Sequence, residues 1–512
     1  MEKLFDSVKE LDKRAEDSFN LKNGVLMEQA ARGMAEYIRR YCTDSATLQN
    51  RSKPSTLQQH TTPSTKPCVQ IACGSGDNGG DGFALARMLG DFCRVRTVAV
   101  FEPKSPLCKL QRERLELLGI PVYTDLIDHC DVLVDAVFGT GIHGLLDEHT
   151  CAVLGQLNAV DGYKIACDIP SGLNTAGIPS PVAFRADTTC TMGALKTALY
   201  ADSAKDYTGT IQLLGLGLPR TSYEGETNTF LLSADDMCLP HRSLQNTHKM
   251  SYGHGVFLCG EKAGACMLAA SAALHFGIGL VTILGTPQPN ALPDFMYSTG
   301  LPDTFSALMV GSGLGRSKTS QLPALHLLAD EQVEERPLIL DADILHSRAI
   351  MSVLPDCKLP ILTPHPKEFQ SLLANSGLAQ VSIAEIQQDR FGYLRLFCTA
   401  FPHAVVVLKG AYPLIGYGTQ IFVNPLGTNA LAKAGTGDVL SGMITALAAQ
   451  GYPPLEAAYT ASLAHAQAAR LLHTDYGLTA SALAASLPDL CRISGEINNA
   501  DASVGVLNHP HE

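Results

Sequence analysis

Apolar and polar positions follow two regular patterns in the first half of the chain. The segment "VLMEQAARGMAEYIRRY" has apolar residues at the spacing of a helical face, and we expect residues 1–42 to be helical. Residues 43–67 are polar and rich in Ser, Thr and Pro, which predicts an exposed loop. Short apolar runs then alternate with helical segments, beginning with the run "CVQIAC" and the helical "FALARMLGDF". This alternation predicts a parallel sheet with crossover helices.

The alternation stops between about 218 and 247, and a second series of apolar runs follows. These runs are "GVFLC", "LVTIL", "ALMVGSG", "LILDAD", "LPILTP" and "AVVVLKG", and the helical "AGTGDVLSGMITALAAQ" comes after them. The two halves share no convincing repeat. We therefore expect an α/β protein with two different domains, each built on its own sheet.

Composition supports a chain with large buried cores. Hydrophobic residues make up 46% of the 512 positions and charged residues 17%, which is unlike a disordered chain. The formal net charge is -12, and basic residues form no long run, so nucleic acid is not expected as a partner. An acidic protein can still bind phosphate locally, through backbone amides and helix ends.

The cysteines indicate the cellular compartment of the protein, and the longest uncharged run raises the question of a membrane span. The 15 cysteines include no C-x-x-C pair, and many lie inside apolar runs. We expect free buried thiols in the reducing cytoplasm, and neither a zinc site nor a disulfide framework. The charged start "MEKLFDSVKELDKRAED" does not resemble a signal peptide. Residues 264–285 carry no formal charge, but they are rich in Ala, Ser and Gly, so we expect a buried helix and a strand and no membrane span.

The stretch "GSGDNGGDG" (74–82) directly follows an apolar run. Ligands of parallel sheets bind beyond the carboxyl ends of the strands. Glycines let a ligand approach the backbone, and the following helix start offers N–H groups to an anion. Asn78 can offer an oxygen to a cation, and Asp81 can cap the helix or accept a sugar hydroxyl. A tight structural turn is the alternative interpretation of this stretch.

Two more strand ends, "DAVFGTGIHG" and "DIPSGL", carry an Asp beside small residues. Asp135, Ser171 and Asn78 could converge on one cation, and ligation by oxygen alone favours a hard ion. Asp168 can act as an acid or base at the ligand. Helix N-capping is the alternative for each Asp taken alone. Three such ends in one sheet favour a binding site.

Together, "LMEQAA", "GSGDNGGDGFALAR", "DAVFGTG" and "DIPSGL" resemble the NAD(P)H-hydrate epimerase family, over roughly residues 1–218. The resemblance implies a Rossmann-like three-layer sandwich and a K⁺ ion held by Asn78, Asp135 and Ser171. It also implies a catalytic role for Asp168 at the reacting ring. The residues implied to bind the hydrated nicotinamide nucleotide are Asp77, Asn78, Gly79, Gly80, Asp81, Gly139, Thr140, Gly141, Ile142, His143, Gly144, Leu145 and Asp168.

The stretch "AKAGTGDVLSGMITAL" is the most informative part of the second half. A glycine turn opens a helix, so Gly435, Thr436 and Gly437 can present amides to a transferring phosphoryl group. Asp438 is placed to take a proton from an attacking hydroxyl. No Gly-Lys-Ser/Thr follows, which excludes a Walker P-loop. The alternative is that Asp438 only caps a buried helix.

Other strand ends of the second half add polar groups, in "GSGLG", "LDADIL", "TPHPKEF" and "VVLKGA". His365 lies between two prolines, and this rigid turn could fix it against a ligand. An ordinary hydrogen bond within the loop is the alternative for this histidine. Lys409 ends an apolar strand and needs an anionic partner, which is either a phosphate or a carboxylate such as Glu368.

The motifs "HKMSYGH", "GSGLG", "LDAD", "TPHPKEF", "VVLKG" and "AGTGD" resemble, in this order, the ribokinase-like NAD(P)H-hydrate dehydratase family over roughly 240–495. The resemblance implies a ribokinase-like three-layer sandwich. It implies that a nucleotide phosphorylates the hydrate and that phosphate elimination restores the reduced nicotinamide, with Asp438 as the base and Mg²⁺ in this domain. The residues implied to contact the hydrate are Ala265, Gly315, His365 and Asp438. The residues implied to bind the nucleotide are Lys409, Gly410, Ala411, Tyr412, Pro413, Gly435, Thr436 and Gly437.

Both halves in one chain resemble the bifunctional repair enzyme family of microbes, which implies ADP as the co-substrate and the hydrates of NADH and NADPH as substrates. We also expect a homo-oligomer. Position 77 is Asp where the family usually has Asn, and "HKMSYGH" departs at Met250 and Ser251 from the usual His-Lys-Gly opening. The expected parts are an epimerase domain (1–218), a linker (219–240), a dehydratase domain (241–495) and a tail (496–512).

Two other functions fit parts of the sequence. A small-molecule kinase of ribokinase type is compatible with "AGTGD" alone, but the epimerase-like half argues against it. A binding or scaffold protein with a degenerate epimerase half has only the Asp at position 77 in its favour.

Overall fold

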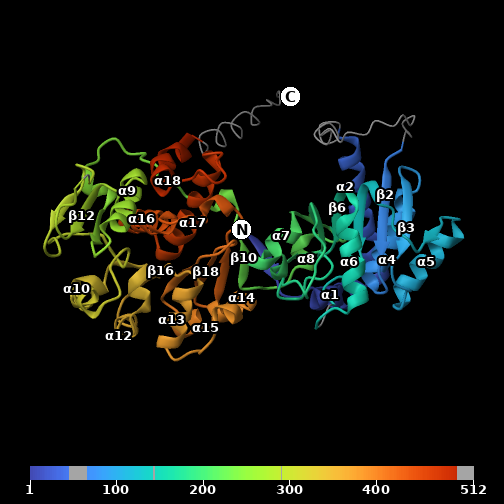
Figure 1. The fold of residues 1–512 in the computed structure, drawn as a ribbon, viewed down its shortest axis with the longest axis horizontal. Helices are drawn as coiled ribbons and strands as arrows, with labels where there is room; N and C mark the ends of the chain where they lie inside the picture. Colours follow the sequence, from blue (N-terminus) through green and yellow to red (C-terminus); the bar gives the residue numbers. More distant parts are fainter. Residues whose placement is uncertain (45–65, 142–143, 290, 493–512) are drawn as a thin grey trace, which may run out of the picture. The chain divides into compact units, whose positions relative to one another are not determined.

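The computed structural model describes residues 1–44, 66–141, 144–289 and 291–492 (Figure 1). The chain divides into two compact units between Thr227 and Asn228, and Met1–Glu2 belong to the second unit. Most of the loop expected at 43–67 and the whole tail expected at 496–512 lie outside the described residues. Each unit is an α/β sandwich with its own sheet, and each is described below by itself.

The first unit contains one parallel sheet with the strand order β4-β3-β2-β5-β6-β7-β9. The central strand β2 is buried along its whole length, as the apolar run "CVQIAC" predicts. The strands are β2 (Cys68–Cys73), β3 (Arg94–Ala99), β4 (Val122–Tyr123), β5 (His129–Ala136), β6 (Asp161–Cys167), β7 (Thr188–Met192) and β9 (Thr210–Leu214).

Helices cover both faces of this sheet. An apolar core lies on each face of the sheet, because successive side chains of β2 point to opposite faces. Val69, Ile71 and Cys73 pack in the core that includes α2 and α4. Cys68 and Ala72 pack in the core that includes α6. The expected three-layer sandwich is therefore confirmed for this unit. Its helices are α1 (Lys9–Phe19), α2 (Asn23–Thr43), α4 (Asp77–Leu89), α5 (Pro106–Leu117), α6 (Glu148–Ala159), α7 (Lys205–Thr208) and α8 (Arg220–Tyr223).

The expectation of continuous helix over residues 1–42 is wrong at its start. Glu2–Phe5 form a strand, β1, which pairs in parallel with the short β8 (Leu195–Lys196). Leu4 and Phe5 are buried there. A partner almost two hundred residues away in sequence decides this strand, so the local pattern could not reveal it.

The second unit contains a sheet with the order β13-β12-β11-β14-β15-β16-β17-β18-β19-β10. Its pairs are parallel except for the hairpin contacts of β18 with β17 and β19. The strands are β10 (Thr229–Leu231), β11 (His254–Leu258), β12 (Leu280–Leu284), β13 (Met296–Ser298), β14 (Ala307–Val310), β15 (Pro337–Leu340), β16 (Leu359–Leu362), β17 (Val405–Leu408), β18 (Leu414–Tyr417) and β19 (Gln420–Val423).

Figure 1 shows α9, α16, α17 and α18 on one side of this sheet and α10, α12, α13 and α15 on the other. The first group shares one large apolar core with the strands, and α15 packs on β17 and β18. This confirms the second three-layer sandwich. The helices are α9 (Ala263–His275), α10 (Lys318–Leu328), α11 (Glu331–Glu334), α12 (Ile350–Val353), α13 (Pro366–Asn375), α14 (Ile383–Gln388), α15 (Arg390–Ala400), α16 (Thr436–Ala449), α17 (Pro454–Leu471) and α18 (Ala480–Ser486).

The uncharged run 264–285 folds as expected into most of the helix α9 followed by the strand β12. Helix α9 is rich in alanine, which lets it pack closely against α16. Among the described residues, no helix combines the length and apolar character that a membrane crossing requires.

Candidate active sites

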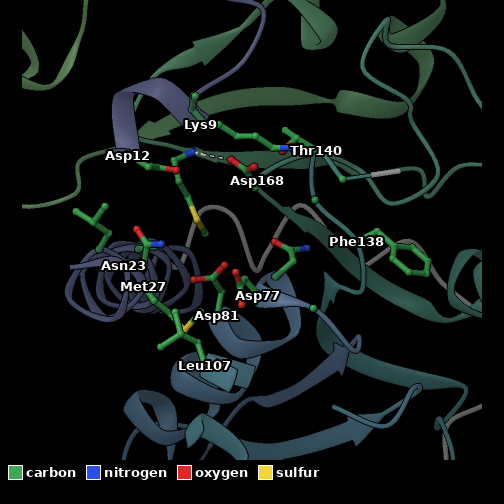
Figure 2. A pocket seen from close by; sticks show the side chains of 18 of the residues that line it. Lys9, Asp12, Asn23, Met27, Asp77, Asp81, Leu107, Phe138, Thr140 and Asp168 are labelled. Atoms are coloured by element: carbon green, nitrogen blue, oxygen red, sulfur yellow. Dashed lines mark hydrogen bonds between the residues drawn. The ribbon is translucent and has the colours of Figure 1, made fainter. Parts of the chain in front are cut away.

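A cavity of about 450 Å³ opens in the first unit beyond the carboxyl ends of β2, β5 and β6 (Figure 2). Its lining includes Asp77, Asn78 and Asp81 after β2, the segment 137–141 after β5, and Asp168 after β6. These three strands are neighbours in the sheet. The sequence-based expectation that three strand ends meet at one site is therefore correct.

The helix α4 begins earlier than the sequence suggests. Gly76 is its N-cap residue and makes no side-chain cap, so the first-turn amides face the cavity without a capping partner. Asp81 lies inside the helix, and the idea that it caps the helix is wrong. A Cβ atom on Gly79 would stand 2.1 Å from the carbonyl oxygen of Gly74, which explains why glycine is needed at this tight turn.

Asp168 is held in a strained and specific position. Its φ angle of 72° lies in the left-handed region, which is unusual for a residue other than glycine. Its Oδ1 atom accepts hydrogen bonds from the Met192 amide at 3.1 Å and from the Lys196 ammonium at 2.6 Å. Lys196 is 1% exposed and also donates to the Thr191 hydroxyl. Lys196 was not expected at the site, although a lysine inside the apolar "MGALKTALY" was a usable signal.

Further carboxyl groups share the cavity with Asp168. Burial raises the pKa of Asp81 well above its usual range, and the charges of Asp168, Asp77 and Asp12 raise it further. Burial likewise raises the pKa of Asp12, although a hydrogen bond of 2.6 Å from the Tyr223 hydroxyl acts in the opposite direction. Asp12 and Tyr223 were not expected at the site, because they come from α1 and α8, far from the glycine motifs in sequence.

The expected cation ligands lie close to this cavity. Asp135 is fully buried and accepts hydrogen bonds from the Ser171 hydroxyl at 2.6 Å and the Ser171 amide at 2.8 Å. Burial raises the pKa of Asp135 to about 6, and the hydrogen bonds from Ser171 oppose this rise. Both polar atoms of the Asn78 amide are buried, and within the described part of the chain they have no hydrogen-bond partner. The three side chains therefore offer oxygen atoms that could bind a cation, and the amide group of Asn78 has no hydrogen-bond partner among the described residues.

Other expected residues of the first unit have different surroundings. Gly80 packs against Met27 and Cys108 and does not line the cavity. Gly144 and Leu145 are exposed and lie outside the lining as well, so direct substrate contact by them stays a prediction. Ile142 and His143 lie outside the described residues.

In the second unit, the glycine turn before α16 has the expected form. Gly435 is the N-cap residue, with a φ angle of 88° and no side-chain cap. The side chain of Asp438 does not cap the helix, so the capping alternative is wrong. Burial and, to a lesser extent, the charge of Asp341 raise the pKa of Asp438 to about 6, although the Ser312 hydroxyl opposes the rise. The turn is anchored by buried His465, whose Nε2 lies 2.9 Å from the Thr436 carbonyl oxygen.

Lys409 extends from the end of β17 toward this turn. A Cβ atom on Gly437 would stand 3.2 Å from its Nζ atom, so the ammonium lies directly beside the glycine turn. The ammonium binds Asp341 at 2.7 Å, and the Ser441 hydroxyl donates to the same carboxylate at 2.7 Å. Burial lowers the pKa of Lys409, but Asp341 and Glu368 raise it above its usual value overall. Of the two alternatives for Lys409, the structure shows the carboxylate one, but the direct partner is Asp341 and not Glu368.

His365 is the N-cap residue of α13. Its Nδ1 atom accepts the backbone amides of Lys367 and Glu368, and the Glu368 carboxylate accepts the backbone amide of His365. The hydrogen bond within the loop is therefore confirmed. The ring is 45% exposed, so contact with a ligand stays a prediction.

The segment after β17, which carries the expected nucleotide-binding residues, is shaped by a buried arginine. Arg390 is 4% exposed and donates to the carbonyl oxygens of Leu408 and Tyr412, both at 3.0 Å. Gly315 has a φ angle of 93° and donates its amide to Asp343 at 3.0 Å, while Ala265 lies in the first turn of α9. Asp343 belongs to the strand end "LDADIL", from which the sequence predicted polar groups, whereas Arg390 was not expected at the site.

Comparison with known proteins connects both sites to one family. A family model described as the YjeF-related protein N-terminus matches residues 23–198, and one described as NAD(P)H-hydrate dehydratase matches residues 256–489. The bifunctional NAD(P)H-hydrate repair enzyme Nnr of Helicobacter pylori is 38% identical, over 93% of this chain and 97% of its own length. This chain belongs to the bifunctional NAD(P)H-hydrate repair enzyme family.

Other members of the repair enzyme family show the same relation. The Escherichia coli enzyme is 31% identical, over 80% of this chain and 81% of its own length. A solved ADP/ATP-dependent NAD(P)H-hydrate dehydratase from Bacillus subtilis, co-crystallised with ATP and Mg²⁺, is 29% identical, with a TM-score of 0.42, and covers 50% of this chain and 94% of its own. The two family models and the curated relatives confirm the expected family and the expected enzyme, an NAD(P)H-hydrate epimerase joined to a dehydratase.

Proposed function

We propose that the cavity of the first unit interconverts the R- and S-hydrates of NADH and NADPH, and that the turn before α16 dehydrates the S-hydrate with ADP. The observation that carries the second assignment is the placement of Asp438. It lies beside uncapped helix amides and the Lys409 ammonium, and its pKa of about 6 suits a general base near neutral pH.

The dehydration takes two balanced steps. In the first, Asp438 takes the proton of the hydrate hydroxyl while the β-phosphoryl group of ADP moves to that oxygen, and the bond to AMP breaks. The amides of Thr436 and Gly437 and the ammonium of Lys409 offset the charge of the phosphoryl group. In the second step the carbon–oxygen bond breaks, phosphate leaves, and the neighbouring ring carbon loses a proton. The products are AMP, phosphate and the reduced nicotinamide nucleotide.

A Mg²⁺ ion fits this unit only as a companion of the nucleotide. Among the described residues, no group of three or more His, Cys, Asp or Glu side chains could hold a metal ion. Mg²⁺ is commonly bound through one or two carboxylates together with substrate phosphates. Asp438 in the first turn of α16 and Asp341, which accepts a hydrogen bond from Ser441 of the same helix, are candidate carboxylates, and the ion would neutralise phosphate charge there.

For the epimerisation, we assign Asp168 as the group that acts at the reacting ring. The two hydrates differ at the carbon that carries the hydroxyl, so the reaction needs a group that gives a proton to this hydroxyl as it leaves and removes one as water returns on the other face. The Asp168 carboxyl points into the cavity, where this exchange would take place (Figure 2). Lys196 positions it and stabilises its charged form.

K⁺ is the best candidate for an ion bound by the buried polar side chains beside the cavity. The Asn78 amide lacks a partner within the described residues, and Asp135 and Ser171 supply two more oxygen donors. Such donors suit a hard cation. The ion would hold the loops after β2, β5 and β6 together and offset the charge of Asp135.

The dehydratase assignment is tested with purified S-hydrate and ADP. We expect AMP, phosphate and reduced nicotinamide to form in equal amounts, and we expect ATP to be the poorer co-substrate. Consumption of ADP with another alcohol while the hydrate stays unchanged would support a small-molecule kinase instead.

A further inference from the structure

One wall of the cavity in the first unit comes from outside the segment that the family model matches. That model covers residues 23–198, whereas α1 contributes Lys9 and Asp12 to the lining and its N-cap residue contributes Val8. The side chain of Tyr223 from α8 also lies in the lining and donates a hydrogen bond to Asp12. The N-terminal helix is therefore part of the binding site.

Lys9 differs from every other charged residue described in this lining. The others are Asp12, Asp77, Asp81 and Asp168, and Lys9 is the only lysine or arginine. Asp168 already has a cationic partner in Lys196, and Asp12 accepts a hydrogen bond from Tyr223. Within the described part of the chain, the Lys9 ammonium makes no hydrogen bond and no ion pair. It is thus a cation at the cavity that none of the described protein groups neutralises.

The surroundings of Lys9 suit a phosphate group. In Figure 2 its side chain extends from α1 toward Thr140, in the glycine turn after β5. The uncapped start of α4 lines the same cavity and offers backbone amides with the positive end of the helix dipole. A lysine ammonium adds a point charge that attracts phosphate oxygens.

We propose that Lys9 binds a phosphate group of the dinucleotide hydrate and thereby positions the substrate for epimerisation. This assignment rests on the proposed epimerase function of the cavity. The substrate carries a bridging diphosphate in both its forms and an additional 2′-phosphate in NADPH hydrate. In a cavity with four carboxyl groups, a free ammonium offsets the repulsion that a phosphate would otherwise meet. Because Lys9 touches a part of the substrate that does not react, it is expected to act on binding and not on the chemical step.

The test replaces Lys9 by alanine and measures epimerisation of both hydrates. We expect the KM to rise roughly three- to tenfold in Lys9→Ala with kcat unchanged, which is the size of a partly exposed ion pair to phosphate. Lys9→Arg should keep most of the wild-type affinity. Lys13→Ala is the matched control, because Lys13 lies one turn further along α1, is exposed and does not line the cavity.

The two substrates identify which phosphate is bound. An equal rise in KM for both hydrates assigns Lys9 to the bridging diphosphate, and a rise for NADPH hydrate alone assigns it to the 2′-phosphate. The wild-type protein is measured first, since its failure to epimerise would overturn the proposed function itself. If the wild-type epimerises and Lys9→Ala has the KM of Lys13→Ala for both hydrates, the role of Lys9 is overturned while the epimerase function stands.

Discussion

At the scale of single residues, the proposed mechanism rests on one carboxyl group in each unit, Asp168 and Asp438, and each lies in a defined charge environment. The sequence predicted Asp438 and Asp168, because both follow apolar runs beside small residues. It did not predict their partners. Lys196 was not named at all, and Asp341 was named only within the motif "LDADIL"; their contacts with Asp168 and Lys409 form only when the fold brings separate strands together. Such partners depend on tertiary contacts, which no local pattern contains.

Removal of the Asp438 carboxyl should abolish dehydration. In Asp438→Ala we expect kcat on S-hydrate with ADP to fall by at least about 100-fold, the usual contribution of a general base. The side chain does not cap α16, so the fold should remain intact. The measurements are reduced-nicotinamide absorbance and thermal unfolding. Turnover close to the wild-type rate would show that another group removes the proton.

The rate of dehydration should depend on pH near the pKa of Asp438. Burial raises this pKa to about 6, and only the deprotonated carboxylate accepts the hydroxyl proton. The rate on pure S-hydrate should therefore fall as the pH drops below about 6 and level off above it. A profile recorded with intact protein that is flat between pH 5 and 8 would argue against Asp438 as the base.

Loss of the Asp168 carboxyl should affect only the epimerase. With an equal mixture of both hydrates and ADP, Asp168→Ala should convert the S-form and then stop, leaving the R-form behind. Lys196→Met should slow epimerisation as well, because it removes the cation that holds Asp168. Complete conversion by Asp168→Ala at the wild-type rate would remove this residue from the mechanism.

At the scale of elements, the alternation of apolar runs and helical segments predicted the strands that carry the sites. The strand β1 and the early start of α4 were missed, because strand pairing and close glycine contacts at 74 and 79 determine them. The hairpin of β18 and β19 was also not predicted. Its strands are only four residues long, and they gain their stability from pairing with β17 and β10.

The packing of α16 on α9 positions the glycine turn of the dehydratase site. A Cβ atom on Gly442 would stand 2.0 Å from the Ala269 carbonyl oxygen, so Gly442→Ala should push the helices apart and destabilise the second unit by roughly 1–3 kcal/mol. Gly264→Ala is the control, because nothing lies within 4 Å of the added atom. Urea unfolding measures both variants. Equal midpoints for Gly442→Ala and the wild-type would contradict the close packing.

At the scale of the whole molecule, the two units divide one repair task. Each has its own core and its own parallel strands, and each has a carboxyl group beside a glycine-lined helix start: Asp168 shares its cavity with the start of α4, and Asp438 lies in the first turn of α16. Only the joint presence of two motif sets led from the sequence to a bifunctional enzyme, since either set alone fits other functions. The contribution of the N-terminal helix to the cavity could not be predicted from the motifs, because Lys9 and Asp12 line the cavity without belonging to any motif.

The most direct test of two cooperating sites is a conversion assay on an equal mixture of R- and S-hydrates, with ADP and, in parallel, with ATP. Reduced-nicotinamide absorbance is followed to completion with the full-length chain. We expect the whole mixture to return to the reduced nucleotide in the presence of ADP. A plateau at half conversion would contradict the epimerase, and no conversion would contradict the dehydratase.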